Sequence, residues 1–206
     1  MRSGQREGPG RRERNKHHTR TTLAQAALRL FAERGYDEVT VAEIAAAAGV
    51  STRTFFGYYP SKADVLFTGA GQRLAVIGGL LAEQAAAGAP PIAALRAALT
   101  SLLSTTGDDL FGPNRSLRVQ LILDRADLRE RATHLVLAAQ HQIVAHLVRA
   151  YPDQLDEDHA VVLVGGLLGA LLAAIGHAIA HDHSPQRIHD TVDRVFTLVE
   201  RAAAQP

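Results

Sequence analysis

The chain of 206 residues has no cysteine, no tryptophan and a single methionine. The absence of cysteine excludes disulfides, thiolate metal sites and a thiol nucleophile. The N-terminus also lacks an apolar signal region, so we expect a cytoplasmic protein rather than a secreted one. Hydrophobic residues make up 47% of the chain and aromatic residues only 5%, which predicts a helical protein with a core rich in alanine and leucine.

The net charge is small as well, +1 at pH 7, but it is unevenly distributed. Residues 1–20 hold seven Lys/Arg against two Asp/Glu. A basic segment can follow DNA phosphates or enter the minor groove, with an affinity that falls as salt rises. We therefore expect a flexible basic arm over residues 1–18, although residues 1–12 could equally be a disordered leader. The better candidates for DNA contacts lie nearer the first helix: Arg14, Lys16 and Arg20.

Two short helices joined by a tight turn are expected just before Pro60. Thr40 and Glu43 have the spacing of a capping box, which begins the first helix. Gly49 follows that helix where a left-handed backbone is usually needed. Ser51 is placed to cap the second helix, which Pro60 ends. This order of elements predicts a helix-turn-helix DNA reader.

The second of these helices has an inner and an outer face. Phe55 and Tyr59 are four residues apart and are expected to face the core. On the outer side, arginine suits a guanine edge or a phosphate, hydroxyls suit base edges or phosphates, and phenylalanine suits a thymine methyl. The alternative is a small helical hairpin whose aromatic residues are all core. The residues with these groups are Thr52, Arg53, Thr54 and Phe56, while Tyr58 and Lys62 lie toward the end of the unit and suit phosphate oxygens.

The segment from Ala26 to Leu66, AALRLFAERGYDEVTVAEIAAAAGVSTRTFFGYYPSKADVL, resembles the TetR family of bacterial transcriptional regulators. The similarity lies in LFAERGY, T-V-x-x-I-A and G-V-S-x-x-T-F-F-x-Y-Y-x-S-K, in order and without gaps. Phe56 stands where tyrosine is commoner, and Gly57 stands where a larger residue often reaches DNA, so the operator sequence is not implied. With Gly57 and Arg20 added, the expected DNA-binding residues are Thr40, Thr52, Arg53, Thr54, Phe56, Gly57, Tyr58, Lys62 and Arg20.

Helical periodicity continues through the remainder of the chain, without a convincing strand or repeat. Helix one is expected to start at Thr21 or Thr22, and helix four to run from Ser61 to about Ala87. Further helices are expected at 92–105, 116–124, 127–151, 157–181 and 185–204, with a loop at 107–114. The predicted fold is all-α with about nine helices: the arm 1–18, a three-helix DNA-binding domain at 19–65, and a helical effector-binding and dimerisation domain at 66–206.

The stretch from Val161 to Ala180 is apolar and long enough to cross a bilayer. Its Gly165-x-x-x-Gly169 pattern also matches the close packing of membrane helices. Acidic residues flank it on one side, however, and basic anchors and an aromatic belt are missing. The resemblance instead implies a homodimer through about 157–204, and we expect that and no membrane.

Histidine is the remaining chemical feature, with ten in the chain. His177 and His181 have the i, i+4 spacing of a helical metal pair, with His183 and Asp182 nearby. No HExxH-type glutamate accompanies them, and histidines at a helix end are also favoured by its dipole. We therefore expect no metal, no cofactor and no enzymatic activity.

By resemblance, the helical body binds a small molecule that releases the DNA. Sparse polar groups usually orient such a ligand in a mostly apolar site, which favours a hydrophobic effector. The function we predict is that of a homodimeric repressor of a palindromic operator, with double-stranded DNA and an unknown effector as partners. The candidate effector-binding residues are Arg118, Gln120, His134, Gln140, His141 and His177.

Overall fold

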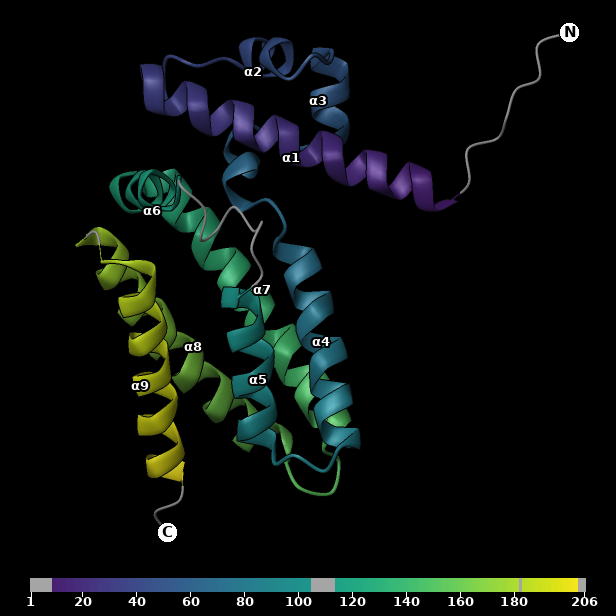
Figure 1. Ribbon diagram of the computed structural model, residues 1–206, viewed down its shortest axis with the longest axis vertical. Helices are drawn as coiled ribbons and strands as arrows, with labels where there is room; N and C mark the ends of the chain where they lie inside the picture. The colour runs from purple at the N-terminus through teal and green to yellow at the C-terminus, as the bar shows by residue number, and fades with distance from the viewer. Residues whose placement is uncertain (1–8, 105–113, 182, 204–206) are drawn as a thin grey trace, which may run out of the picture. The chain divides into compact units, whose positions relative to one another are not determined.

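The computed structural model describes residues 9–104, 114–181 and 183–203. These residues form helices and connecting turns without a strand, so the all-α prediction is confirmed. The chain divides into two compact units, Met1–Thr68 and Gly69–Pro206 (Figure 1). We refer to the first as the head and to the second as the body.

The head contains three α-helices and one 3-10 helix, and α2 and α3 lie on the same side of α1 (Figure 1). Its core is formed by large apolar side chains, of which Phe31, Ile44 and Phe55 are buried. These side chains come from all three α-helices, so burial of their apolar faces holds the short helices in place. The elements are α1 (Pro9–Arg34), α2 (Val41–Ala47), α3 (Thr52–Tyr58) and η1 (Ala63–Phe67).

Helix α1 begins at Pro9, well before the expected start at Thr21 or Thr22. The threonines do not cap a helix here. The Thr19 hydroxyl donates to Asn15 O at 2.9 Å, and the Thr22 hydroxyl donates to His18 O at 2.9 Å. Such bonds to the preceding turn keep threonine inside a helix. Residues 9–18, which were expected to belong to a flexible arm, are therefore helical.

The expected fourth helix is interrupted. The 3-10 helix η1 ends at Phe67, and Gly69 adopts φ 80° before α4 begins at Ala70. A residue with positive φ cannot continue a right-handed helix, and glycine adopts this conformation without strain. The expected helix from Ser61 to Ala87 is thus two elements on either side of the boundary between head and body.

The described residues of the body form six helices, and all but α4 lie at nearly the expected positions. They are α4 (Ala70–Ala86), α5 (Pro91–Ser104), α6 (Arg115–Asp124), α7 (Ala126–Ala150), α8 (Glu157–Ala180) and α9 (Pro185–Ala203). The expected loop at 107–114 lies almost entirely outside the described residues. The start of α8 and the end of α4 have clear causes. Asp156 caps α8 by accepting from His159 N at 2.8 Å, and Gly88 takes φ 80° after α4.

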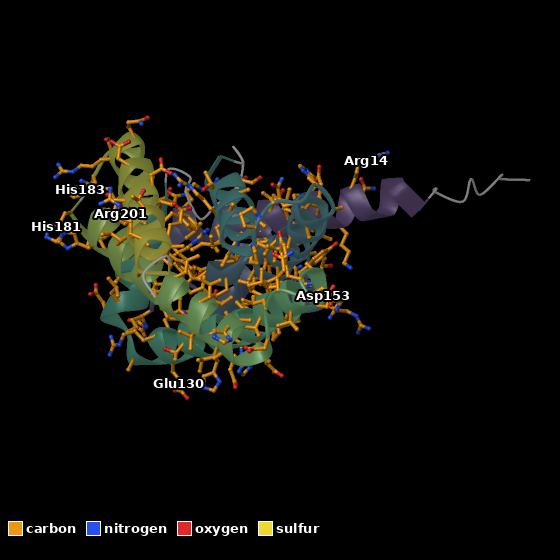
Figure 2. All side chains as sticks on the ribbon, turned by 90° about the horizontal axis from the view of Figure 1, so that it is seen from below. Arg14, Glu130, Asp153, His181, His183 and Arg201 are labelled. Atoms are coloured by element: carbon orange, nitrogen blue, oxygen red, sulfur yellow. The ribbon has the colours of Figure 1, made fainter. Side chains whose placement is uncertain are left out.

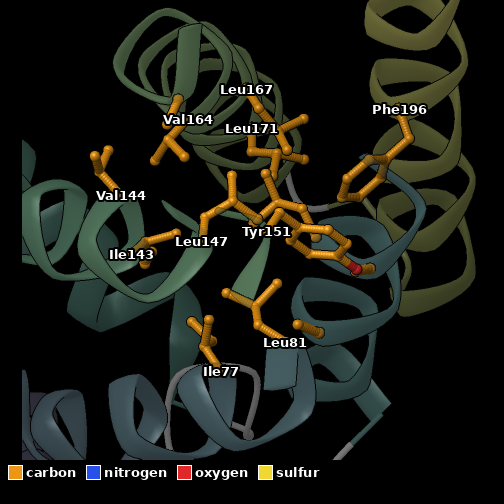
Figure 3. Close-up of a cluster of buried hydrophobic side chains, with 14 of the residues drawn as sticks. Ile77, Leu81, Ile143, Val144, Leu147, Tyr151, Val164, Leu167, Leu171 and Phe196 are labelled. Atoms are coloured by element: carbon orange, nitrogen blue, oxygen red, sulfur yellow. The ribbon is translucent and has the colours of Figure 1, made fainter. Parts of the chain in front are cut away.

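The core of the body is an apolar cluster between α4, α5, α7, α8 and α9 (Figure 3). Leu81, Leu147 and Phe196 are buried in it, each from a different helix. Tyr151 is buried at its edge, where the hydroxyl donates to Ala89 O at 2.8 Å. The phenol therefore ties the end of α7 to the turn between α4 and α5.

Two stretches of the described residues, Ala63–Ala86 and Glu157–Ala180, could cross a membrane by length and composition alone. The first includes the break at Gly69. The second is α8, from which Val164 and Leu167 are buried in the core of the body. Because the core helix of a soluble protein passes the same test, the apolar length of α8 is weak evidence for a membrane segment.

Candidate nucleic-acid interface

The start of α2 is fixed by the expected capping box. Glu43 N donates to the Thr40 hydroxyl at 3.3 Å, while Thr40 N donates to Glu43 Oε2 at 2.8 Å. The Thr40 hydroxyl also donates to the same carboxylate oxygen at 2.7 Å, and Arg34 Nη1 donates to Glu43 Oε1 at 2.7 Å. The Thr40 proton is thus directed at Glu43, so this residue positions α2 in the free protein.

The same contacts lower the pKa of Glu43 from 4.5 to about 2. The hydrogen bond from the Thr40 backbone is the main cause, followed by those from the Thr40 hydroxyl and from Arg34. A lowered pKa stabilises the fold at pH values above the unfolded-state pKa, and this stabilisation is lost as the pH falls through the folded-state value.

We expect Glu43→Gln to be less stable than the wild type above pH 4.5, with the difference shrinking as the pH falls toward about 2. Unfolding followed by circular dichroism at several pH values measures this difference. An NMR titration of the Glu43 carboxyl provides the direct check, and a midpoint near 4.5 would contradict the prediction.

The turn between α2 and α3 has the geometry expected from the sequence. Gly49 takes φ 70°, and Val50 N donates to Ala45 O at 2.9 Å, which closes the end of α2. Ser51 then caps α3, because its hydroxyl accepts from Thr54 N at 3.1 Å. These local hydrogen bonds by themselves set the orientation of α3 relative to α2.

Helix α3 separates its aromatic residues as expected. Phe55 and Tyr59 are buried in the head, with ring centroids 5.7 Å apart. Phe56 is 53% exposed and meets Phe55 edge-on, with centroids 5.5 Å apart. A large exposed aromatic residue beside a basic residue is typical of a binding surface. The other exposed residues of this face are Thr52, Arg53 and Gly57.

Thr54 and Tyr58 are only partly exposed. The Thr54 hydroxyl lies 2.8 Å from the Ser51 hydroxyl, within the cap of α3. Tyr58 is at the end of α3, and its carbonyl accepts from Arg20 Nη2 at 3.1 Å. Fewer side chains of α3 are therefore fully exposed than the sequence led us to expect for DNA contacts.

Lys62 has a different role in the structure from the phosphate contact that its sequence position indicated. Its ammonium group donates to Tyr36 O at 2.7 Å, to Val39 O at 2.9 Å and to Asp37 O at 3.4 Å. It also lies 4.4 Å from the centroid of the Tyr36 ring. An ammonium has three donors, and here all three serve the loop between α1 and α2. We assign Lys62 to positioning this loop.

Sequence reasoning missed a second set of contacts, between α1 and the end of α3. Tyr59 Oη donates to Arg20 O at 2.9 Å and lies 2.8 Å from the Thr68 hydroxyl. The Arg20 guanidinium carbon lies 5.5 Å from the centroid of the Tyr59 ring. The sequence identified Tyr59 as core from its spacing, but nothing local indicated that its hydroxyl meets Arg20 and Thr68. Together these contacts fix α1, α3 and the end of η1 relative to one another.

Gly57 allows the stability of α3 to be tested. A Cβ added to Gly57 meets nothing within 4 Å, and alanine is favoured over glycine inside a helix by about 1 kcal/mol. Gly57→Ala should therefore stabilise the head by about that amount, as measured by amide hydrogen exchange in α3. The matched control is Gly49→Ala, which should be destabilising because φ is 70° there. Slower exchange in both variants would contradict this account.

The structure distributes the candidate effector-binding residues of the body between interior and surface. Arg118 on α6 is only 1% exposed, and Gln140 on α7 is half-buried with Nε2 2.9 Å from the Cβ position of Gly165. The other four side chains are exposed and do not line an interior site: Gln120, His134, His141 and His177. Their spacing in the sequence alone did not distinguish core from surface.

The sequence also gave no reason to single out His146. This half-buried residue of α7 packs its ring against Gly78 of α4, where an added Cβ would lie 2.7–2.9 Å from ring atoms. A side chain at position 78 would therefore force the His146 ring to move. The imidazole ring of His146 therefore lies between α7 and α4.

His177, His181 and His183 come together at the end of α8, where Figure 2 labels the latter two. The His177 and His181 rings stack with centroids 4.1 Å apart, and His183 lies about 6 Å from both, at 6.1 and 6.2 Å. Burial, followed by nearby Arg187 and the other two histidines, lowers the pKa of His183. Among the described residues no group of three His, Cys, Asp or Glu could hold a metal ion, and Asp182 lies outside them.

Comparisons with known proteins agree with this division of the chain. Residues 23–68 match the family described as bacterial regulatory proteins, tetR family, and residues 89–204 match the family described as MftR C-terminal domain. TcmR of Streptomyces glaucescens, an HTH-type transcriptional regulator, is 36% identical over 118 residues, which are 56% of this chain and 51% of TcmR. The chain thus spans about half the length of this relative. A putative mycofactocin biosynthesis transcriptional regulator, MftR of Mycobacterium tuberculosis, is 29% identical over 81% of each chain.

Solved structures have the same fold. FadR of Thermus thermophilus, a TetR-family repressor in complex with lauroyl-CoA, has a TM-score of 0.59 and 26% identity over 87% of this chain and 92% of its own. FadR of Bacillus halodurans has a TM-score of 0.57 and 19% identity, covering 95% of this chain and 96% of its own. The second similarity concerns the fold alone.

Proposed function

This chain belongs to the TetR family of bacterial transcriptional regulators, and from that premise we propose that it is a homodimeric repressor, released from a palindromic operator by a largely hydrophobic effector. The proposal assigns DNA recognition to α3, dimerisation to α8 and α9, and effector binding to the body. It includes no catalytic step, and it places the protein with its DNA in the cytoplasm.

The observation that carries the proposal is the exposed face of α3. Arg53 and Phe56 are exposed there, while Phe55 on the opposite side is buried. A major groove admits one helix and presents guanine acceptors and thymine methyls. Arginine and phenylalanine supply the matching donor and apolar surface. Ser51 caps the N-terminal end of α3, and this is the end of a recognition helix that usually contacts bases.

Dimerisation is supported by the need for binding area and by the surface of the body. A single seven-residue recognition helix buries too little surface for a specific site, whereas two copies one DNA turn apart read a palindrome. Large apolar side chains are exposed on the two last helices, including Val162 at 75% and Leu198 at 65%. Burying them against a second copy would remove apolar surface from water.

The effector is proposed from the composition of the body and from one relative. Arg118 and Gln140 are the two original candidates shielded from solvent, and apolar helices surround the core of the body. Such a site favours a ligand that is mostly apolar with few polar groups. The Thermus FadR structure contains lauroyl-CoA, so we propose a fatty acyl thioester as the effector class.

Binding-site selection on random duplex DNA with the purified protein tests the central claim. A repressor of this kind selects a palindrome, and sedimentation of the complex gives two chains per site. Acyl-CoA esters of increasing chain length are then titrated into the complex, with free CoA as the control. Selection of no preferred sequence would overturn the regulator assignment, whereas release by no acyl-CoA would overturn only the effector class.

A further inference from the structure

The first turns of α1 extend beyond the packed part of the head. The helix begins at Pro9, the side chains of residues 14–18 are all exposed, and full burial starts at Leu23. The stretch from Pro9 to Arg20 is about 18 Å long at 1.5 Å per residue, and Figure 1 shows α1 continuing past α3 in this direction. We call residues 9–20 the α1 extension.

The α1 extension is helical because the packed part of α1 continues into it. An isolated helix of this length is marginal in water, since forming its first turn costs more than extending an existing helix. Burial of Leu23 and Phe31 fixes the later turns. The exposed side chains of residues 14–18 project from this helix and are available to a partner outside the molecule.

The charge of the α1 extension indicates what that partner is. Residues 9–20 hold five Lys/Arg against a single acidic residue, Glu13, and no further acidic residue occurs before Glu33. The first turn of α1 has no acidic side chain. Positive charge near a helix N-terminus opposes the helix dipole, so this distribution does not help the isolated helix. The positive charge of the α1 extension instead suits binding to a polyanion.

The contacts of Arg20 set the orientation of the α1 extension. Arg20 donates to Tyr58 O at 3.1 Å and accepts from Tyr59 Oη at 2.9 Å through its own carbonyl. These bonds turn the side of α1 that carries Arg20 toward the end of α3. Lys16 lies one turn earlier on the same side, because residues four apart share a face. Arg14 is two residues from Lys16 and therefore points to the other side, exposed as Figure 2 shows.

We propose that the α1 extension is a rigid arm that lies along the phosphate backbone flanking the bases read by α3, with Lys16 on the phosphate-facing side. This inference rests on the proposed function, since α3 must first place the duplex. A length of about 18 Å corresponds to about five base pairs at 3.4 Å each. Phosphate contacts carry no base specificity but fix the register of the protein on DNA.

Two duplexes that contain the selected operator test the arm. The short duplex ends at the outermost base pairs of the palindrome, and the long duplex has about eight further base pairs on each side, which exceeds the reach of the arm. Fluorescence anisotropy gives Kd for each duplex over a range of KCl concentrations. The variants are Lys16→Ala and its matched control Arg29→Ala, which removes the same charge from an exposed position of α1 outside the extension, on roughly the opposite side of the helix. Alanine has the highest helix propensity, so neither change weakens α1.

We expect the wild type to bind the long duplex more tightly than the short one. Lys16→Ala should lose roughly tenfold in affinity for the long duplex, and its log–log salt slope should fall by about 2 for the two copies in a dimer. On the short duplex Lys16→Ala should match the wild type. Arg29→Ala should stay close to the wild type on both duplexes.

Three results would overturn the arm. An unchanged affinity and salt slope for Lys16→Ala on the long duplex would mean that the extension does not touch DNA. Equal losses for Arg29→Ala and Lys16→Ala would mean that the overall positive charge of the head, and not a directed contact of Lys16, attracts the DNA. Binding of neither duplex by the wild type would overturn the proposed function together with the arm, so the two failures are distinguishable.

Discussion

Replacing Arg53 with alanine should weaken specific binding to the operator by roughly 30-fold or more while leaving the head folded. Arg53 is exposed at the start of α3, and the cap there is formed by Ser51 and Thr54. A good contact from an arginine to a base contributes about 1–3 kcal/mol of discrimination. In a dimer the contact is made twice, so the loss is about 2–6 kcal/mol, or roughly 30-fold and more in Kd.

The measurement is anisotropy on the selected palindrome and on a scrambled duplex of equal length. Arg29→Ala is the matched control, because it removes an exposed arginine from α1 of the same head. Arg53→Lys separates two kinds of contact. Lysine keeps a phosphate contact but cannot form the bidentate contact with guanine. Wild-type affinity of Arg53→Ala for the palindrome would contradict the assignment of α3 as the reading helix.

Replacing Lys62 with methionine should destabilise the head in the absence of DNA. The ammonium donates to the carbonyl oxygens of Tyr36, Asp37 and Val39, and hydrogen bonds that involve a charged group contribute about 1.5–3 kcal/mol each. Lys62 is half-buried, so solvent screening reduces the sum, and we expect a loss of about 2–4 kcal/mol. Methionine keeps an unbranched apolar stem against the Tyr36 ring, which limits the change to the charge.

Amide hydrogen exchange in α2 and in the loop before it measures this loss without requiring the whole chain to unfold in one step. The control is Lys16→Met, the same change at the other lysine of the chain, which is exposed. Lys62→Met should exchange faster in this region and Lys16→Met should not. If Lys62→Met weakened DNA binding with unchanged exchange, the phosphate contact implied by the family resemblance would be the correct role.

Lys62 shows what a family motif can indicate about a residue and what only the structure can show. The motif identified a lysine after the recognition helix, and its proximity to DNA-facing residues indicated a phosphate contact. The structure brings this lysine to three carbonyls contributed by residues 36–39, more than twenty positions earlier. Sequence spacing does not report such a contact, because it depends on how η1 packs against α1.

The sequence by itself determined the elements whose causes are local. The cap at Thr40, the left-handed Gly49 and the cap at Ser51 each depend on residues within about one helical turn. The inward position of Phe55 and Tyr59 followed from helical periodicity alone. For the same reason the all-α class and the positions of the body helices could be predicted.

Features that depend on contacts between residues far apart in the chain were decided only by the tertiary structure. The early start of α1, the break at Gly69 and the burial of Arg118 had no local signal strong enough to compete with the expected pattern. Helix propensity is a small term, and packing overrides it. Thus the sequence determined that this chain carries a helix-turn-helix head on a helical body. The tertiary structure decided which polar side chains hold that head together and which of them remain exposed to meet DNA, because burial and hydrogen-bond partners are set by residues far apart in the chain.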